Sequence, residues 1–204
     1  MLRNTFFAVS AVLAVAAASH AANITFSTRS EPTPGMATHT TWIVTANSNV
    51  PMQGFDFAGD GSNDPATGKG FFGPMNQLNP AGQATVYSDN NVLITALGGN
   101  PKQDSQFIVT TGSVVVPAGF AEEGSNILQG IWAHSAPVGN TFDLAQLVIP
   151  NGAAATVNFR GTIATLENNQ LVDNNVSGSV PIPEPASLAL IAIGLVGFIA
   201  RKRS

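Results

Sequence analysis

Four carboxylate and amide side chains gather in one short stretch of the chain, DFAGDGSNDP. They are Asp56, Asp60, Asn63 and Asp64. Carboxylate and amide oxygens are the ligands that Ca²⁺ prefers, so calcium is the cofactor that this loop allows. The spacing departs from the EF-hand pattern, however, and no bidentate glutamate closes the loop. An ordinary turn is the alternative, because Asp and Asn side chains also form hydrogen bonds with their own backbone.

Nucleophilic catalysis would have to use a serine, because the chain contains no cysteine. His39 and His134 are the histidines that follow the N-terminal segment. His134 stands beside Ser135, but adjacent residues of a strand point to opposite faces and do not easily share a proton. The sequence also contains neither a Gly-x-Ser-x-Gly elbow nor a His-Glu-x-x-His zinc pattern. We therefore expect both histidines at the surface or rim, no catalytic residues, and a protein that is not an enzyme.

Exposed aromatic rings would offer a different chemistry, the stacking of sugars. Trp42 and Trp132 each fall within an apolar segment, where a large ring is usually buried. Tyr87, in TVYSD, is the ring that we expect to be exposed. Contact with polysaccharide would then depend on this residue.

The elements that position these residues are short and rich in Val, Ile, Thr and aromatics. Clusters of Gly, Pro, Asn and Asp separate them, which is typical of strands joined by turns. The sequence predicts an all-β fold, an antiparallel two-layer β-sandwich. Helix is expected only in an N-terminal signal helix, a C-terminal hydrophobic helix and one short turn near residues 121–129. The segments expected as strands include NITFSTR, HTTWIVTA, QGFDFAG, ATVYSD, NVLITAL, QFIVTTGSVVV, ILQGIWA, DLAQLVI and TVNFRGTIATL. In the last of these, Thr156, Asn158, Arg160 and Thr162 alternate with Val157, Phe159 and Ile163, so one face of this strand should meet the core.

The charge of the central part of the chain excludes one class of partner. Between Ala22 and Val180 there are eleven acidic and four basic residues, a net charge of −7. Nucleic-acid binding requires a basic patch, so no nucleic-acid partner is expected. The lack of cysteine means that no disulfide framework stabilises the fold.

The N-terminus has the three parts of a secretory signal peptide. Arg3 supplies a positive charge, residues 6–18 form an apolar run, and Ser19, His20 and Ala21 give a small-x-small cleavage pattern. The run is shorter than the ~20 residues of a spanning helix. We predict a signal peptide over residues 1–21, export by the Sec machinery, and a β-sandwich domain over residues 22–178.

The C-terminus, residues 179–204, combines a proline motif, an apolar run and a basic end. The run from Leu188 to Ala200 carries no charge, and Arg201, Lys202 and Arg203 follow as a membrane stop. A helix over residues 186–200 would rise only ~22 Å, against a hydrocarbon core of ~30 Å, so it is a marginal anchor. The positive-inside rule places everything before the run outside the cell.

Pro183, Glu184 and Pro185, followed by this apolar run and basic end, resemble the PEP-CTERM sorting signal of exported bacterial proteins. The resemblance implies that an exosortase recognises the motif and releases or transfers the protein. The two prolines also favour an extended, protease-accessible segment just outside the bilayer. A plain tail anchor with a proline-rich stalk is the alternative.

The central part of the chain also resembles cohesin-type sandwich domains, over TANSNVPMQGFDFAGD and DLAQLVIP. This resemblance implies the fold alone, because no contact residue of those domains can be assigned here.

Together these features predict an exported, non-enzymatic protein that is anchored in the membrane as a precursor and then resides at the cell surface or in the extracellular matrix. Its role would be structural or adhesive in an exopolysaccharide setting. The expected partners are an exosortase-type enzyme, the Sec machinery, the membrane transiently, and extracellular polysaccharide. The alternative is a secreted carbohydrate-binding module or hydrolase that uses the acidic loop around Asp56–Asp64.

Overall fold

The structure is a computed structural model that describes residues 22–58, 64–78, 86–110, 112–115, 122–152 and 156–180. Of these residues, 58% are in strands and 9% in helices, which confirms the all-β prediction. The long strands are β1 (Ile24–Pro32), β2 (His39–Asp56), β9 (Gly139–Pro150), β10 (Val157–Glu167) and β11 (Gln170–Val180). The short strands are β3 (Gly70–Phe72), β4 (Gln106–Phe107), β5 (Ser113–Val115), β6 (Glu122–Gly124), β7 (Ile127–Gln129) and β8 (Ile131–His134). The helical segments are η2 (Ser88–Asn90), α1 (Asn91–Ala96) and η3 (Pro101–Gln103).

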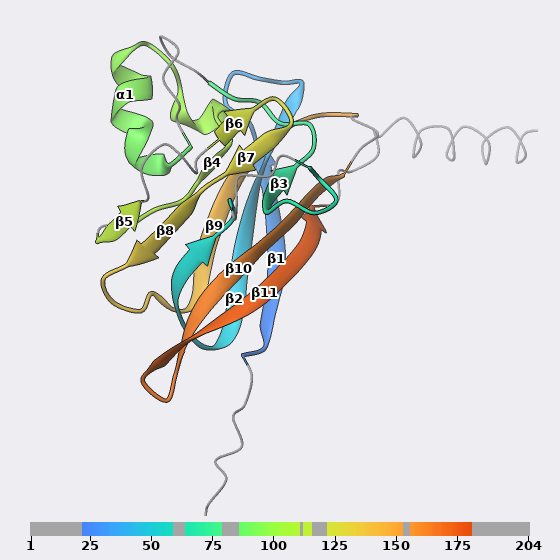
Figure 1. The fold of residues 1–204 in the computed structure, drawn as a ribbon. Helices are drawn as coiled ribbons and strands as arrows, with labels where there is room; N and C mark the ends of the chain where they lie inside the picture. The colour runs from blue at the N-terminus through green and yellow to red at the C-terminus, as the bar shows by residue number, and fades with distance from the viewer. Residues whose placement is uncertain are drawn as a thin grey trace, which may run out of the picture.

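These strands form one antiparallel sheet that curls until it is nearly closed, like a barrel (Figure 1). Its main path runs β4-β9-β2-β10-β3-β7-β6, and β1, β8 and β11 pair with β2 or β10. The register of β2 against β9 shifts between Asn47 and Met52. Up to Ser48 β2 pairs with β1 and β9, at Met52 it pairs with β9 and β10, and over residues 54–56 it pairs with β8 and β10. The finer prediction of two separate layers is not confirmed, because β2 belongs to both groups of strands.

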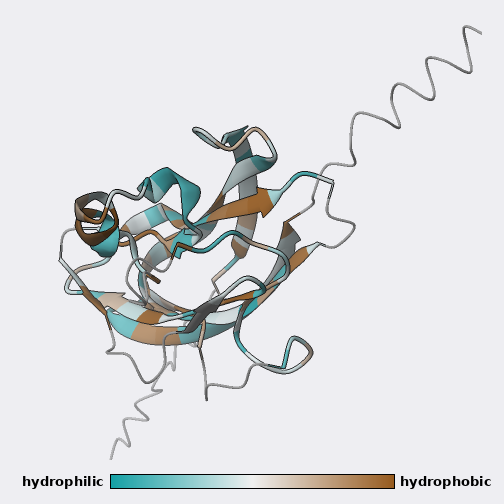
Figure 2. Ribbon diagram, turned by 90° about the horizontal axis from the view of Figure 1, so that it is seen from above, coloured by the Kyte–Doolittle hydropathy of each residue, from teal (hydrophilic) through white to brown (hydrophobic). Residues whose placement is uncertain are grey.

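The core lies inside the curled sheet and is rich in aromatic rings. Along β10, Val157, Phe159 and Ile163 are buried while Asn158 and Arg160 are exposed, as the sequence alternation predicts. Figure 2 shows the same alternation as apolar and polar bands along the strands. The rings at the centre contact one another at centroid distances of 4.7 to 6.2 Å and belong to Phe55, Phe57, Phe71, Phe107 and Trp132.

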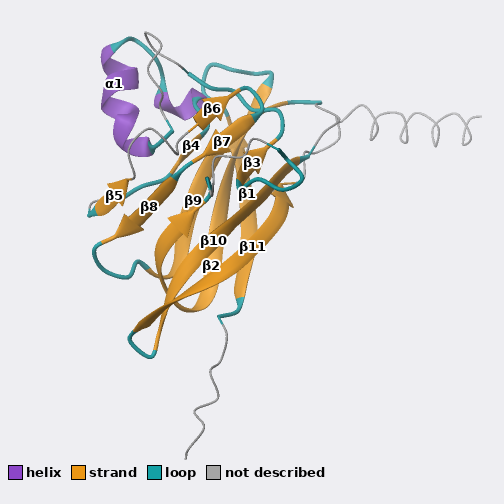
Figure 3. Cartoon of the chain, in the orientation of Figure 1, coloured by secondary structure: helices purple, strands orange, loops and turns teal. Residues whose placement is uncertain are grey.

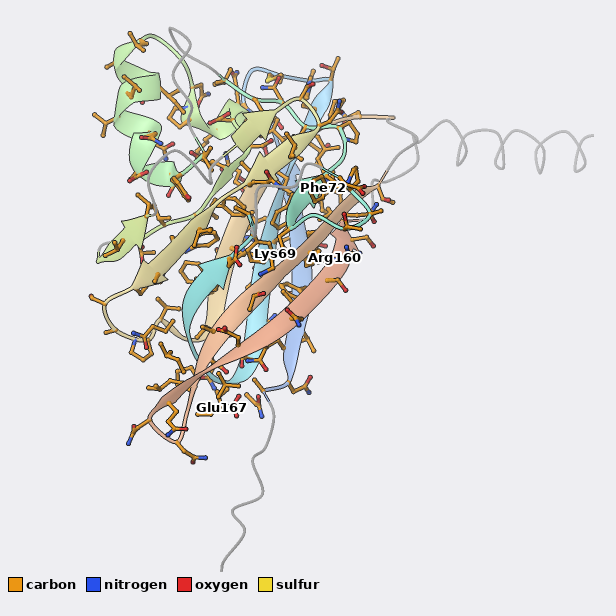
Figure 4. All side chains as sticks on the ribbon, viewed as in Figure 1. Lys69, Phe72, Arg160 and Glu167 are labelled. Atoms are coloured by element: carbon orange, nitrogen blue, oxygen red, sulfur yellow. The ribbon has the colours of Figure 1, made fainter. Side chains whose placement is uncertain are left out.

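A tight hairpin joins β10 to β11 at one end of the molecule. Its two central residues, Asn168 and Asn169, have φ values of 51° and 62°, which suits the primed turns that follow the twist of a hairpin. The backbone N–H of Ala22 donates to Glu167 Oε1 at 3.2 Å. The described chain therefore begins at the same end as this hairpin, where Figure 4 labels Glu167.

Some secondary-structure predictions are wrong. Residues 91–97, predicted as a strand, contain α1, and the predicted helical turn near residues 121–129 is the β6–β7 hairpin (Figure 3). ATVYSD was also predicted as a strand, but its Tyr87 forms an isolated bridge with Phe107 and its last two residues belong to η2. The strand prediction for NVLITAL rested on its β-branched residues. In the structure this segment forms α1, whose only buried residue is Ile94. A strand at this position would have needed a second buried face.

The predicted terminal helices, over residues 1–21 and beyond residue 180, lie outside the described residues. No helix within the described part has both the length and the apolar character that crossing a membrane requires. β11 continues to Val180, so the sheet runs two residues past the predicted boundary at residue 178.

Candidate functional site

Five neighbouring strands place a row of side chains across the outer face of the sheet. Asp173 of β11 pairs with Ala164 of β10, which pairs with Gly54 of β2. Gly54 pairs with Ala133 of β8, and Ala133 pairs with Val114 of β5. The three small central residues form the floor of a surface trough of about 370 Å³, and Asp173 and Val114 stand at its two sides. We call this feature the trough.

An ion pair and a hydroxyl group line the next row of the trough. Lys69 Nζ lies 2.5 Å from Asp56 Oδ2, and both side chains are about one-third exposed. Asp56 pairs across β2 and β10 with Thr162, whose hydroxyl donates to Asn175 Oδ1 at 3.2 Å. A part-exposed ion pair adds only ~0–1 kcal/mol to stability, so its atoms can exchange partners with a polar ligand at little cost. Figure 4 labels Lys69 on this face.

The trough combines an apolar floor with clustered donors and acceptors. A sugar presents apolar C–H groups together with hydroxyls that both donate and accept, so its chemistry complements this surface. Lys69 supplies donors, Asp56 and Asp173 supply acceptors, and the Thr162 hydroxyl, whose hydrogen is donated to Asn175, supplies a further acceptor. A carboxylate held by an ammonium group is an acceptor, whereas a glycosidase needs one carboxyl that carries a proton. The arrangement therefore suits binding better than hydrolysis.

The sequence analysis identified Asp56 but missed Lys69, Thr162 and Asp173 as neighbours. These residues lie in separate segments, and only the register of β2, β10 and β11 brings them together. The alternation along residues 156–163 did indicate that Thr162 faces away from Phe159 and Ile163. It gave no indication of what lies beside Thr162.

The two described members of the predicted calcium loop make local contacts. Asp56 Oδ1 accepts from the Ala58 N–H at 3.1 Å, and Asp64 accepts from the Ala66 N–H at 2.9 Å and the Thr67 hydroxyl at 3.0 Å. The backbone hydrogen bond from Ala66 lowers the pKa of Asp64.

These contacts are those of turn residues. Asp60 and Asn63 lie outside the described residues, and among the described ones no cluster of three His, Cys, Asp or Glu side chains could hold a metal. Calcium binding at this loop stays a prediction.

His134 is buried rather than at the surface, which corrects the sequence-based expectation. It pairs across β5 and β8 with Ser113, and its Nδ1 lies 3.2 Å from Ser113 Oγ. Its ring packs edge-on against Phe55 and Phe142. Nε2 is buried without a partner, so no third group orients the ring as in a catalytic triad. The contact instead fixes the edge strand β5 to β8.

This burial predicts a loss of stability in mild acid. Removal from water lowers the pKa of His134 below its ordinary value, so the unfolded chain takes up the proton more readily than the folded one. The free energy of unfolding should be constant above about pH 6.5, where both states are neutral, and should fall as the pH drops below it. The measurement is the melting temperature at about pH 7.5 and 5.5. His134→Phe, which keeps a flat ring, should lose less stability over that interval than the parent, and an equal loss would contradict this account.

Tyr87 is also buried, contrary to the expectation of an exposed ring. Its side chain is 6% exposed, and its hydroxyl donates to Ile131 O at 3.1 Å and accepts from Ile131 N at 2.9 Å. Burial raises the pKa of this phenol. The paired backbone groups explain how a tyrosine can lie inside the sheet. The predicted burial of Trp42 and Trp132 is confirmed.

The predicted sorting residues lie outside the described residues. They are Pro183, Glu184 and Pro185, with Arg201, Lys202 and Arg203 as the membrane stop. The family model of the PEP-CTERM protein-sorting motif matches residues 181–204, immediately after the end of β11.

This motif implies an exported protein that is sorted through an exosortase at the membrane. The chain carries a PEP-CTERM protein-sorting motif over residues 181–204, which supports its recognition as a PEP-CTERM sorting-domain protein. Comparisons with curated proteins and with solved structures found no match. The resemblance of residues 22–178 to cohesin-type domains stays a prediction.

Proposed function

We propose that this exported protein is a non-enzymatic component of the cell surface or extracellular matrix, with a structural or adhesive role in an exopolysaccharide setting. The proposal rests on one observation, the junction of an acidic β domain bearing the trough to the sorting motif at residues 181–204. After exosortase processing, the trough would be the surface that contacts polysaccharide.

Binding without turnover is supported by what the charged and titratable groups contact. Asp143 receives a two-pronged ion pair from Arg29, at 2.7 and 2.9 Å, and a hydrogen bond from Thr45, and its pKa is lowered by Arg29. His134 is buried against aromatic rings. These groups stabilise strand contacts, and a catalytic acid or base must instead meet the substrate.

The outer face of β1, β2 and β9 is polar as well, but its groups bond to one another. Asn47 donates to the Ser27 hydroxyl at 3.2 Å and accepts from the Thr141 hydroxyl at 3.3 Å. Polar groups of the trough are paired too, but the trough adds an apolar floor in a hollow of about 370 Å³, where a ligand can bury part of its surface. The trough is therefore the preferred contact surface.

Filling the trough should abolish glycan binding while leaving the fold intact. Ala133 is exposed at the floor of the trough, and strands accept tyrosine well, so Ala133→Tyr should block access without unfolding the domain. We expect affinity for the producing cell's exopolysaccharide to fall about tenfold or more, a loss of ~1.4 kcal/mol or more. Titration calorimetry of the secreted protein provides the measurement.

Thr25→Tyr is the matched control, because Thr25 is exposed on β1 outside the trough. It should bind like the parent. A hydrolase screen on the same samples tests the alternative: turnover that an Asp56→Asn variant loses would establish an enzyme and overturn the proposal. If both tyrosine variants bind glycan equally well, the trough is not the contact surface, and that part of the proposal is wrong.

A further inference from the structure

A second hollow, of about 400 Å³, lies beside the outer edge of β11. One wall is formed by the start of the described chain and β1, including Asn23, and the other by β11, including Asn175 and Ser177. Among the described strands, β1 pairs with β2 alone and β11 with β10 alone, so the curled sheet stays open between β1 and β11. Figure 1 shows these two strands along the same side of the molecule. We call this hollow the seam.

Polar groups of the seam have no partner within the described part of the chain. The side chains of Asn23 and Ser177 form no hydrogen bond there, and Asn175 uses only its Oδ1, which accepts from the Thr162 hydroxyl at 3.2 Å. The edges of β1 and β11 that face the seam add unpaired backbone N–H and C=O groups. The seam therefore offers both donors and acceptors to a ligand.

The lining of the seam favours an uncharged ligand rich in hydroxyl groups. No side chain that lines it carries a charge, so a charged ligand would find no counter-ion there. Ile24 and Phe26 supply apolar surface beside the amides and the hydroxyl. A neutral sugar has hydroxyls that donate and accept, together with ring C–H groups that pack on apolar side chains. Its chemistry complements the seam as it does the trough.

The seam and the trough meet at β11. Asp173 lines the trough, and the next two residues, Asn174 and Asn175, line the seam. Thr162 of the trough pairs with Asn175 in the register of β10 and β11, and their side chains share a hydrogen bond. A single strand thus separates the two hollows.

The row of small side chains along the floor of the trough leads toward the seam. It crosses five strands, from Val114 of β5 to Asp173 of β11. Neighbouring strands lie ~4.8 Å apart, so the row is about 19 Å long. A pyranose unit of an extended chain is about as long as one such interval, so about four sugar units cover the row. The next units of a longer chain would pass over β11 and reach the seam.

We propose that the trough and the seam are two parts of one binding track for a linear, uncharged polysaccharide. The inference rests on the proposed function and adds the length and the charge of the chain that the site takes. Once the trough is filled, each contact in the seam forms within the same complex, at a high effective concentration. A fragment that reaches both hollows should therefore bind about tenfold more tightly than one that fills the trough alone.

Fragments of the producing cell's exopolysaccharide are the probes, one of about four units and one about twice as long, titrated into the secreted protein by calorimetry. Ser177→Tyr fills the seam from β11, and strands accept tyrosine well. Ser179→Tyr is the matched control, because Ser179 is exposed on the same strand and lies outside both hollows. Asn23→Tyr fills the seam from its other wall, and melting temperatures show that each variant is folded.

We expect Ser177→Tyr and Asn23→Tyr to bind the short fragment like the parent and to lose the gain on the long one. Ser179→Tyr should keep that gain. The control is decisive, because a longer fragment also gains a little affinity from its greater number of binding positions. Binding of the long fragment should change little between about 0.05 and 0.5 M salt, since an uncharged chain makes no ion pairs. A strong salt dependence would show that the ligand is charged and would overturn that part of the inference.

The same titrations separate a failure of the inference from a failure of the proposed function. If a folded seam variant keeps the full gain on the long fragment, the track is wrong, whereas loss of both fragments by Ala133→Tyr would still support glycan binding in the trough. If Ala133→Tyr binds both fragments like the parent, the trough is not the contact surface and the track fails with it. A parent protein that binds neither fragment would overturn both proposals.

Discussion

Replacing Pro183 and Pro185 with alanine should leave the protein exported but uncut. The signal peptide and the apolar run are unchanged in this variant, so export and membrane insertion continue. Two prolines disfavour helix in the residue before each, so the sequence predicts an extended segment for the exosortase to bind, and alanine would permit a helix there. The PEP-CTERM match at residues 181–204 makes this region the processing signal. Cell fractionation with intact mass, in a host that makes exosortase, measures the outcome.

Deleting residues 188–204 should have the opposite effect and release the protein in soluble form. The motif is retained, but the apolar run and basic end that hold it at the membrane are gone. The proline variant thus tests recognition of the motif by the exosortase, and the deletion tests whether the apolar run and basic end hold the motif at the membrane. If the proline variant is trimmed like the parent and reaches the same fraction, the motif is only a stalk and the plain tail anchor is correct.

Gly161→Ala should destabilise the domain by about 3 kcal/mol, the upper part of the usual range for overpacking. Gly161 lies on the inward face of β10, where an added Cβ would stand 2.6 Å from the Phe57 ring and 2.9 Å from the Asp56 carbonyl oxygen. The backbone oxygen belongs to the neighbouring strand and cannot move without disturbing the pairing. Denaturant unfolding of residues 22–180 measures the change.

Gly54→Ala is the matched control, because its added Cβ would be 3.2 Å from the Ala164 methyl group in the trough. Gly54→Ala should lower the free energy of unfolding much less than Gly161→Ala does. Combining Gly161→Ala with Phe57→Leu should recover part of the lost stability, since the smaller side chain makes room for the methyl group. A Gly161→Ala variant as stable as Gly54→Ala would show that the strands separate there easily.

Where one face of a strand meets the core, the local sequence pattern was enough to predict which side chains are buried. Val157, Phe159 and Ile163 were placed inside from their alternation with polar residues, and they are buried. The same reasoning failed for residues 91–97, where β-branched residues form a helix with one buried side chain. It also failed for Tyr87 and His134. Whether such amphipathic side chains are exposed depends on partners from other strands, Ile131 and Ser113, that no local pattern identifies.

The sequence by itself determined the sorting of this protein, because the signal at residues 181–204 is a linear order of proline motif, apolar run and basic end. Its recognition depends on neighbours in the chain, so no fold is needed to find it. Only the tertiary structure decided where a ligand could bind. The trough exists because β2 exchanges β9 for β8 as its partner after Met52, which places Gly54 between Ala164 and Ala133. A one-residue change of register would turn every one of these side chains to the other face, and register is set by pairing between strands distant in sequence.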